Sequence, residues 1–273
     1  DAVTTVGNLV AVGYGALSAN TSGTSNTAVG YNCGAAITSG ASNTIMGYEA
    51  GDALTSGPRN VAVGSAALTA NTTGANNVAI GTNAMTTDVY SNGTVAVGYQ
   101  ALYTQNYTGA TDSLNTAVGY TAGYYLTTAL SDTLVGWGAG DAITTGSYND
   151  AFGRNALGAC TTGSSNSAFG NLALDALTTG GSNAGFGQHA GGAITTGSQN
   201  ICLGATSGLN ITEGSYNTLV GHAAGDAITT VSNLVAVGRN ALSANTSGTS
   251  NTGVGYQAGA AITSGANNTV IGH

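Results

Sequence analysis

The chain has no lysine and few charged residues of any kind. Its 273 residues include three arginines, Arg59, Arg154 and Arg239, against eleven acids, which gives a formal net charge of −8. A protein that binds nucleic acid needs basic side chains to neutralise phosphates, and an anionic membrane surface requires the same charges. The composition therefore excludes both kinds of partner.

Long apolar runs and cysteine pairs are also lacking. No run of 18 apolar residues exists, so the sequence predicts no insertion into a membrane. Cys33, Cys160 and Cys202 form no CxxC pair and have no histidine at metal-ligand spacing, so we interpret them as small buried residues. The hydrophobic content of 42% is too high for a disordered chain. A folded protein with its own core is expected.

What the sequence has in abundance is glycine in a regular repeat. A phrase typified by Asn26-Thr27-Ala28-Val29-Gly30 recurs throughout. We call its last residue the anchor glycine, and one repeat of the phrase a coil. Positions are numbered from the anchor, so that −1 is the residue before it and +1 is the residue after it. The anchors are Gly13, Gly30, Gly47, Gly64, Gly81, Gly98, Gly119, Gly136, Gly153, Gly170, Gly187, Gly204, Gly221, Gly238, Gly255 and Gly272. The interval is constant except between Gly98 and Gly119, where it is four residues longer. This predicts a single continuous array over residues 1–273, with a four-residue insertion within 103–114. We expect the segment 103–114 to bulge from the stack while the coils on either side keep their register.

The columns of the repeat predict the fold class. Position −1 is always a sizeable apolar residue, position −2 is most often Ala, and position −3 is mostly Val or Thr. Adjacent β-branched residues favour a strand, and a glycine in every coil would destabilise a helix. So short a unit cannot bury its own apolar face, whereas stacked units bury a continuous core. We therefore predict an all-β protein, a parallel β-solenoid or β-roll of about 16 coils with a 17-residue repeat.

Two further columns predict the interior. Position +4 is Leu in some coils and Gly in others, and where Leu is lost an Ile or Leu stands at +7, as Ile37 and Ile143 do. We interpret this as one core volume filled from either of two backbone positions, because native interiors are densely packed. Position −4 is Asn in twelve of the sixteen coils. A column of ligand groups is one reading; a ladder of side-chain amides bonded from coil to coil is the favoured one.

The phrase Asn-Thr-(Ala/Gly)-Val-Gly-Tyr-Gln-Ala-(Leu/Gly), seen at residues 251–259, resembles the head repeats of trimeric autotransporter adhesins and, more closely, repeats of phage tail-fibre-like proteins. The resemblance covers all sixteen coils. It implies a left-handed β-roll, commonly a homotrimer, that serves as a shaft or an adhesive head. The coils here are about three residues longer than the adhesin-head repeat, and no coiled-coil stalk is present.

The strand pattern itself also favours association. Positions −2 and −1 point to opposite faces of a strand, and both are apolar in nearly every coil. One of them faces the core. The other needs a partner surface or must lie in water, which Ala tolerates well. Self-association is therefore expected, as a homotrimer, an end-to-end filament or both.

Catalytic chemistry finds no support in the sequence. His189, His222 and His273 fall in different columns, and no nucleophile elbow or dinucleotide fingerprint occurs in its proper context. Asp52, Asp141 and Asp226 do not have the spacing of the calcium-binding nonapeptide. We expect no enzyme activity, no catalytic residues, no cofactor and no metal.

Two surface features could bind a ligand. Aromatic residues at position +1, with others near the insertion, could stack on sugars or contact a protein; the alternative is cross-coil packing of the rings. The candidate contact residues are Tyr99, Tyr103, Tyr107, Tyr120, Tyr124 and Tyr125. Pairs such as Thr72-Thr73 and Thr195-Thr196 could form a threonine ladder for ice binding, although only one residue of each pair can lie on a given face.

The function predicted from these features is structural: an extracellular fibre or filament shaft at a cell or virion surface, engaged in attachment or adhesion. The alternatives are a glycan-binding adhesin module, with a cell-surface glycan as partner, and an ice-binding solenoid. Residues 1–48 repeat as 226–273, which implies a 225-residue higher-order unit. We therefore expect the array to continue, or to stack end to end.

Overall fold

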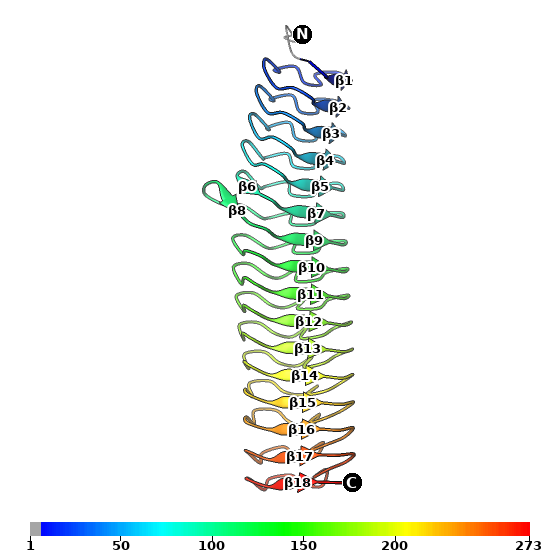
Figure 1. Cartoon of the computed structure of the whole chain (residues 1–273), viewed down its shortest axis with the longest axis vertical. Helices are drawn as coiled ribbons and strands as arrows, with labels where there is room; N and C mark the ends of the chain where they lie inside the picture. The colour runs from blue at the N-terminus through cyan, green and yellow to red at the C-terminus, as the bar shows by residue number, and fades with distance from the viewer. Residues whose placement is uncertain (1–6) are drawn as a thin grey trace. The chain divides into compact units, whose positions relative to one another are not determined.

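A computed structural model describes residues 7–273 and confirms the fold class (Figure 1). The described residues form a parallel β-solenoid with a 17-residue repeat and contain no helix. Sixteen strands have three residues each, and they bound about fifteen turns. The handedness of the roll stays a prediction from the resemblance. The first six residues of the 1–48 copy lie outside the described part.

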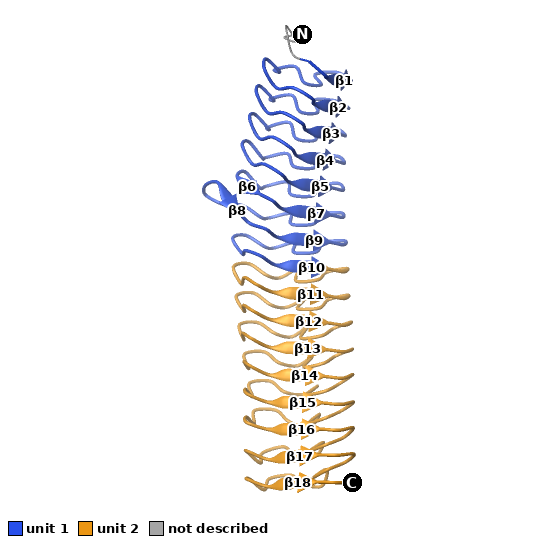
Figure 2. Cartoon of the chain, viewed as in Figure 1, with its two compact units in different colours: residues 1–134 blue, residues 135–273 orange. Residues whose placement is uncertain are grey.

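The chain divides into two compact units, residues 1–134 and 135–273, which Figure 2 colours separately. The division falls within one strand, β10 (Thr133–Val135). The array over 1–273 and its 225-residue unit stay predictions, and the two units are described one at a time.

The first unit contains nine strands before β10. They are β1 (Val10–Val12), β2 (Thr27–Val29), β3 (Thr44–Met46), β4 (Val61–Val63), β5 (Val78–Ile80), β6 (Ser91–Asn92), β7 (Val95–Val97), β8 (Thr111–Asp112) and β9 (Thr116–Val118). The three-residue strands pair in chain order with a 17-residue register, as Val10 with Thr27 does, until β7 pairs Val95 with Thr116. The short strands β6 and β8 pair separately with each other.

The second unit is regular throughout. Its strands are β11 (Asp150–Phe152), β12 (Ser167–Phe169), β13 (Ala184–Phe186), β14 (Ile201–Leu203), β15 (Thr218–Val220), β16 (Val235–Val237), β17 (Thr252–Val254) and β18 (Thr269–Ile271). Each pairs with the next at the same 17-residue register, from Asp150 with Ser167 to Val254 with Ile271. No residue is inserted or lost in this unit.

The anchor glycines are required by backbone geometry. Their φ angles lie between 124° and 146°, a region that side-chain-bearing residues rarely adopt. A Cβ at Gly170 would also lie 2.6 Å from the carbonyl oxygen of Gly187, the anchor of the following coil. Successive anchors stack so closely that any side chain would separate the coils.

The exchange of core volume between positions +4 and +7 is confirmed. Gly34 leaves space that Ile37 fills, since a Cβ on Gly34 would lie 2.9 Å from Cδ1 of Ile37. Leu17, at +4 of the preceding coil, is 1% exposed and is accompanied at +7 by Asn20, which closes its own turn. Both arrangements keep the interior filled.

The asparagine ladder is also confirmed. Oδ1 of Asn183 accepts the backbone N–H of Asn200 at 3.0 Å, and Nδ2 of Asn183 donates to the carbonyl of Gly197 at 2.9 Å. The same two bonds recur from coil to coil, for example at Asn26 and Asn43. The column is structural, because its amide groups are used within the stack.

The projection at the insertion is confined to part of the segment 103–114. The backbone N–H of Asn106 still bonds to the carbonyl of Thr127 in the following coil, and β8 pairs with β6 from Thr111 onward. The extra residues are therefore taken up mainly within 107–110. Tyr107 folds into the interior and is 7% exposed, so only the tip around residues 108–112 projects, at the β8 loop of Figure 1.

Candidate functional site

The outward face of the three-residue strands is the most extensive candidate surface. In strand after strand the residue at −2 is fully buried, as Ala28 and Ala168 are, while the residue at −1 points outward. The small residue is therefore inside, and the larger apolar residue is the one that faces away from the core. Exposed members of this face are Val10, Val12, Met46, Ile80 and Val118 in the first unit, and Phe186, Ile201, Leu203, Val254 and Ile271 in the second.

In the second unit this face carries a ladder of phenylalanines. Phe152 and Phe169 stack with their ring centroids 4.6 Å apart, and Phe169 and Phe186 stack at 4.8 Å. Leu203 continues the column and is 46% exposed. Parallel pairing at constant register puts identical side chains above one another, so the apolar column is continuous within the unit. A continuous column of apolar side chains of this kind is a candidate interaction surface.

The tyrosines near the insertion form a second surface. Tyr99 stacks on Tyr120 with centroids 5.2 Å apart, and Tyr103 stacks on Tyr124 at 5.1 Å. Tyr125 meets the edge of Tyr124 at 4.6 Å. These contacts confirm that the rings pack from coil to coil. Tyr99, Tyr120 and Tyr125 still expose 42%, 50% and 55% of their surface.

Tyr107 does not belong with the exposed tyrosines. Its hydroxyl donates a hydrogen bond to the carbonyl of Ala129 and accepts one from Nδ2 of Asn115 at 3.1 Å. Burial, and then the charge of Asp88, raise the pKa of its phenol above the ordinary value. The prediction that Tyr107 is a surface contact is wrong, because the inserted segment turns this ring inward to fill the coil.

Two shallow hollows share a local sequence pattern that the sequence reasoning missed. Each has an aromatic residue at +1, a glycine at +2, and an asparagine at +2 of the next coil that folds over the glycine. One hollow, of about 550 Å³, is lined by Gly13, Tyr14, Gly15, Ser18 and Asn32. The other, of about 260 Å³, is lined by Trp137, Asp141, Asn155, Gly158, Ala159 and Asp175. Partial burial raises the pKa of both carboxyl groups in the second hollow. An aromatic-glycine pair at +1 and +2 is the signal that would have found them.

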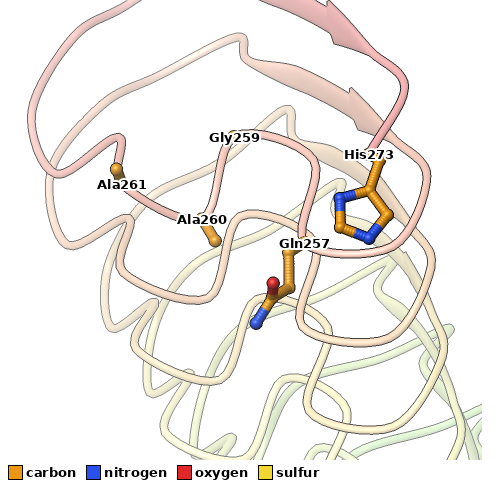
Figure 3. A pocket seen from close by; sticks show the side chains of 5 residues that line it. All are labelled: Gln257, Gly259, Ala260, Ala261 and His273. Carbon is orange, nitrogen blue, oxygen red and sulfur yellow. The ribbon is translucent and has the colours of Figure 1, made fainter.

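A third hollow, of about 480 Å³, lies on the last described coil (Figure 3). Gln257 and His273 supply its polar groups, and the rest of its lining is glycine and alanine. The ring centroids of His273 and Tyr256 lie 5.0 Å apart, and the guanidinium carbon of Arg239 lies over the Tyr256 ring, 5.9 Å from its centroid. Two isolated polar groups give this hollow little means of selecting a ligand.

The cysteines and acids do not gather into a metal centre. Cys33, Cys160 and Cys202 are buried and form no disulfide, and burial raises the pKa of Cys202 to about 12. Over residues 7–273, no three His, Cys, Asp or Glu side chains lie where they could hold a metal ion. The same range contains no helix long and apolar enough to cross a membrane.

A buried polar cluster lies under the insertion in the first unit. Its members are Asp88, Ser91, Thr94, Gln105, Ser113 and Asn115, all inaccessible to solvent. The sequence reasoning missed the cluster because several of its members stand where the column normally holds a different residue: Ser91 replaces a turn glycine, and Thr94 replaces the ladder asparagine. These departures from the repeat are the sequence signal that could have revealed the cluster.

Comparison with known proteins finds no relative. No protein-family model matches the chain, and neither a curated protein nor a solved structure does. The resemblance to tail-fibre and adhesin-head repeats stays a prediction from the motif.

Proposed function

We propose that this chain is a structural module of an extracellular fibre, and that copies of it associate through the outward face of the three-residue strands. The observation that carries the proposal is the column of large apolar side chains at −1, which are exposed or half-buried in the single chain. A homotrimer that brings three such faces to a common axis would cover them, and end-to-end stacking of copies would extend the array. The location at a cell or virion surface rests on the resemblance.

The size of the face suits an interface between copies. Strands about 4.8 Å apart and three residues wide offer about 50 Å² each, so the eight strands β11 to β18 of the second unit offer about 400 Å² per copy, which is about half of what each partner buries in a standard interface. The occupant is a second copy rather than a charged partner, because the face is apolar and the exposed columns of two copies are alike. Burying one exposed Phe or Leu would contribute about 1.5–3 kcal/mol at most.

The test is the mass of the native particle. Light scattering of the purified chain is expected to give a multiple of 26.3 kDa. Phe169→Ser with Leu203→Ser should shift the particle toward the monomer. Tyr148→Ser with Tyr216→Ser is the matched control, since both are exposed apolar residues outside the −1 column. A wild-type chain that stays monomeric at high concentration, or a control that dissociates equally, contradicts the proposal.

A second candidate function is glycan binding by the tyrosines Tyr99, Tyr103, Tyr120, Tyr124 and Tyr125. Exposed rings on adjacent coils supply flat apolar faces with hydroxyl groups at their edges, which suits sugar rings. Binding to immobilised glycans should be lost in Tyr120→Ala with Tyr125→Ala and kept in Tyr14→Ala with Tyr31→Ala. Equal binding by both variants would exclude this surface.

The first residue of each threonine pair bonds within the stack: Thr55 Oγ1 donates to the carbonyl of Thr72 at 2.9 Å, and Thr178 Oγ1 donates to that of Thr195 at 2.9 Å. This gives that column a structural role. The second residue of each pair, such as Thr73 or Thr196, is exposed, so ice binding by this chain would rest on the second column alone.

A further inference from the structure

The buried polar cluster in the first unit contains a nucleophile beside a base. The Ser91 hydroxyl donates to Oδ2 of Asp88, and the other carboxylate oxygen accepts the backbone N–H of Ser91 at 3.1 Å. Both side chains are inaccessible to solvent. Burial raises the pKa of Asp88, which strengthens it as a proton acceptor. A serine hydroxyl bonded to a carboxylate in this way can be activated for attack.

An amide group lies against the same carboxylate oxygen. Nε2 of Gln105 donates to Oδ2 of Asp88 at 2.7 Å and lies 3.3 Å from Oγ of Ser91. The carbonyl oxygen of Gln105 accepts Nδ2 of Asn115 at 2.9 Å. One carboxylate oxygen therefore bridges the nucleophile and the potential leaving nitrogen, while an amide donor stands where negative charge would develop.

We propose that Ser91 and Gln105 join in an ester cross-link between adjacent coils. Oγ of Ser91 forms a bond to Cδ of Gln105 as its proton passes to Oδ2 of Asp88. The Cδ–Nε2 bond breaks, Asp88 returns the proton to the departing nitrogen, and ammonia is released. No oxidant or other reactant is needed, and Asp88 ends as it began. Asn115 holds the carbonyl oxygen throughout.

The surroundings favour this condensation over hydrolysis. Every group in the cluster is buried, and Tyr107, from the inserted residues, closes it with its hydroxyl on Asn115. Ammonia that escapes to solution at neutral pH becomes ammonium and is diluted, which draws the exchange toward the ester. Reacting groups held close together in an interior closed to solvent gain the rate advantage of an intramolecular reaction.

The position of the cross-link matches a break in the asparagine ladder. Thr94 stands in the ladder column, where an amide would otherwise bond to the following coil, and its hydroxyl bonds instead to Ser113. A covalent bond between the coils anchored at Gly81 and Gly98 would secure the stack at this break. The inference does not depend on self-association.

The test is the intact mass of the full chain. Electrospray mass spectrometry of the purified wild type is expected to give the sequence mass less one ammonia. Ser91→Ala and Asp88→Asn should each restore the full mass. Ser91→Ala is suited to the fold, because the equivalent position holds Ala129 in another coil. A wild type of full sequence mass overturns the proposal.

One side reaction needs its own control. The pair Asn92-Gly93 can also lose ammonia by cyclisation onto the backbone, so Asn92→Ala must keep the mass loss. Fragmentation of a proteolytic digest must further show the peptide containing Ser91 joined to that containing Gln105. A loss that vanishes in Asn92→Ala, or survives Ser91→Ala, overturns the assignment.

Discussion

The two units are built from one repeat, yet their interiors differ. Between Asn149 and Asn217 the second unit has an unbroken ladder, in which every side-chain amide bonds to the next coil. The first unit breaks the same column at Thr94 and fills the space with hydroxyls, an amide and a carboxylate. A regular column satisfies its polar groups by repetition alone. Where the column is broken, the buried polar groups need a hydrogen-bond network that occurs only once in the chain. Such a network can bring reactive groups together.

The largest contrast should come from glycine. Gly170→Ala in the second unit puts a Cβ 2.6 Å from a carbonyl oxygen at a φ of +143°, whereas a Cβ on Gly109 in the insertion has no atom within 4 Å. We expect Gly170→Ala to lower the free energy of unfolding by more than about 4 kcal/mol, from combined overlap and backbone strain. Gly109→Ala should change it by less than about 0.5 kcal/mol. Urea unfolding of both variants measures the difference, and similar midpoints would contradict it.

The ladder should give the next effect. Asn183→Ala leaves the N–H of Asn200 and the carbonyl of Gly197 without their partner, which costs about 2–4 kcal/mol. Asn106→Ala, at an exposed residue beside the insertion, is the control and should be nearly neutral. Amide hydrogen exchange should show lost protection in the coils on both sides of Asn183. An unchanged exchange pattern there would mean that the ladder contributes little.

The fold could be predicted from the sequence because its causes repeat. The anchor glycines, the −2 and −1 alternation and the Asn column each state one local requirement in coil after coil, so their periods reveal the solenoid. The inward turn of Tyr107 could not be predicted, since it occurs once and depends on how four inserted residues fold. The cluster of Asp88, Ser91 and Gln105 was missed for the same reason: three single departures from columns become a site only after the coils are stacked.

Core volume offers a smaller effect that tests the interchangeability of coils. In the second unit, a Cβ on Gly191 would lie 2.9 Å from Cδ1 of Ile194 and 2.7 Å from Cδ2 of Leu174. Gly191→Leu alone should destabilise the chain by about 1–3 kcal/mol through overpacking. Adding Ile194→Asn copies the arrangement of Leu242 and Asn245, so the double variant should recover about half of that loss. A double variant less stable than the single would show that the two arrangements are not exchangeable.

The smallest expected effect concerns the buried carboxyl of the irregular interior. Burial raises the pKa of Asp88 above its ordinary value, although hydrogen bonds from Ser91 and Gln105 oppose the shift. Between the ordinary carboxyl pKa and the raised one, the folded chain holds a proton that the unfolded chain has released. Stability due to Asp88 therefore falls as pH rises through that window and is level above it.

Asp88→Asn, which matches Asn20 and Asn245 in the same column, should remove this loss of stability. With Ser91→Ala in both chains to prevent any cross-link, the Asn chain should be the more stable at neutral pH, and the two stability curves should converge as pH falls toward the ordinary carboxyl range. Unfolding measured across that range checks the sign, and curves that diverge on acidification would show that Asp88 is held ionised by its donors rather than destabilised by burial.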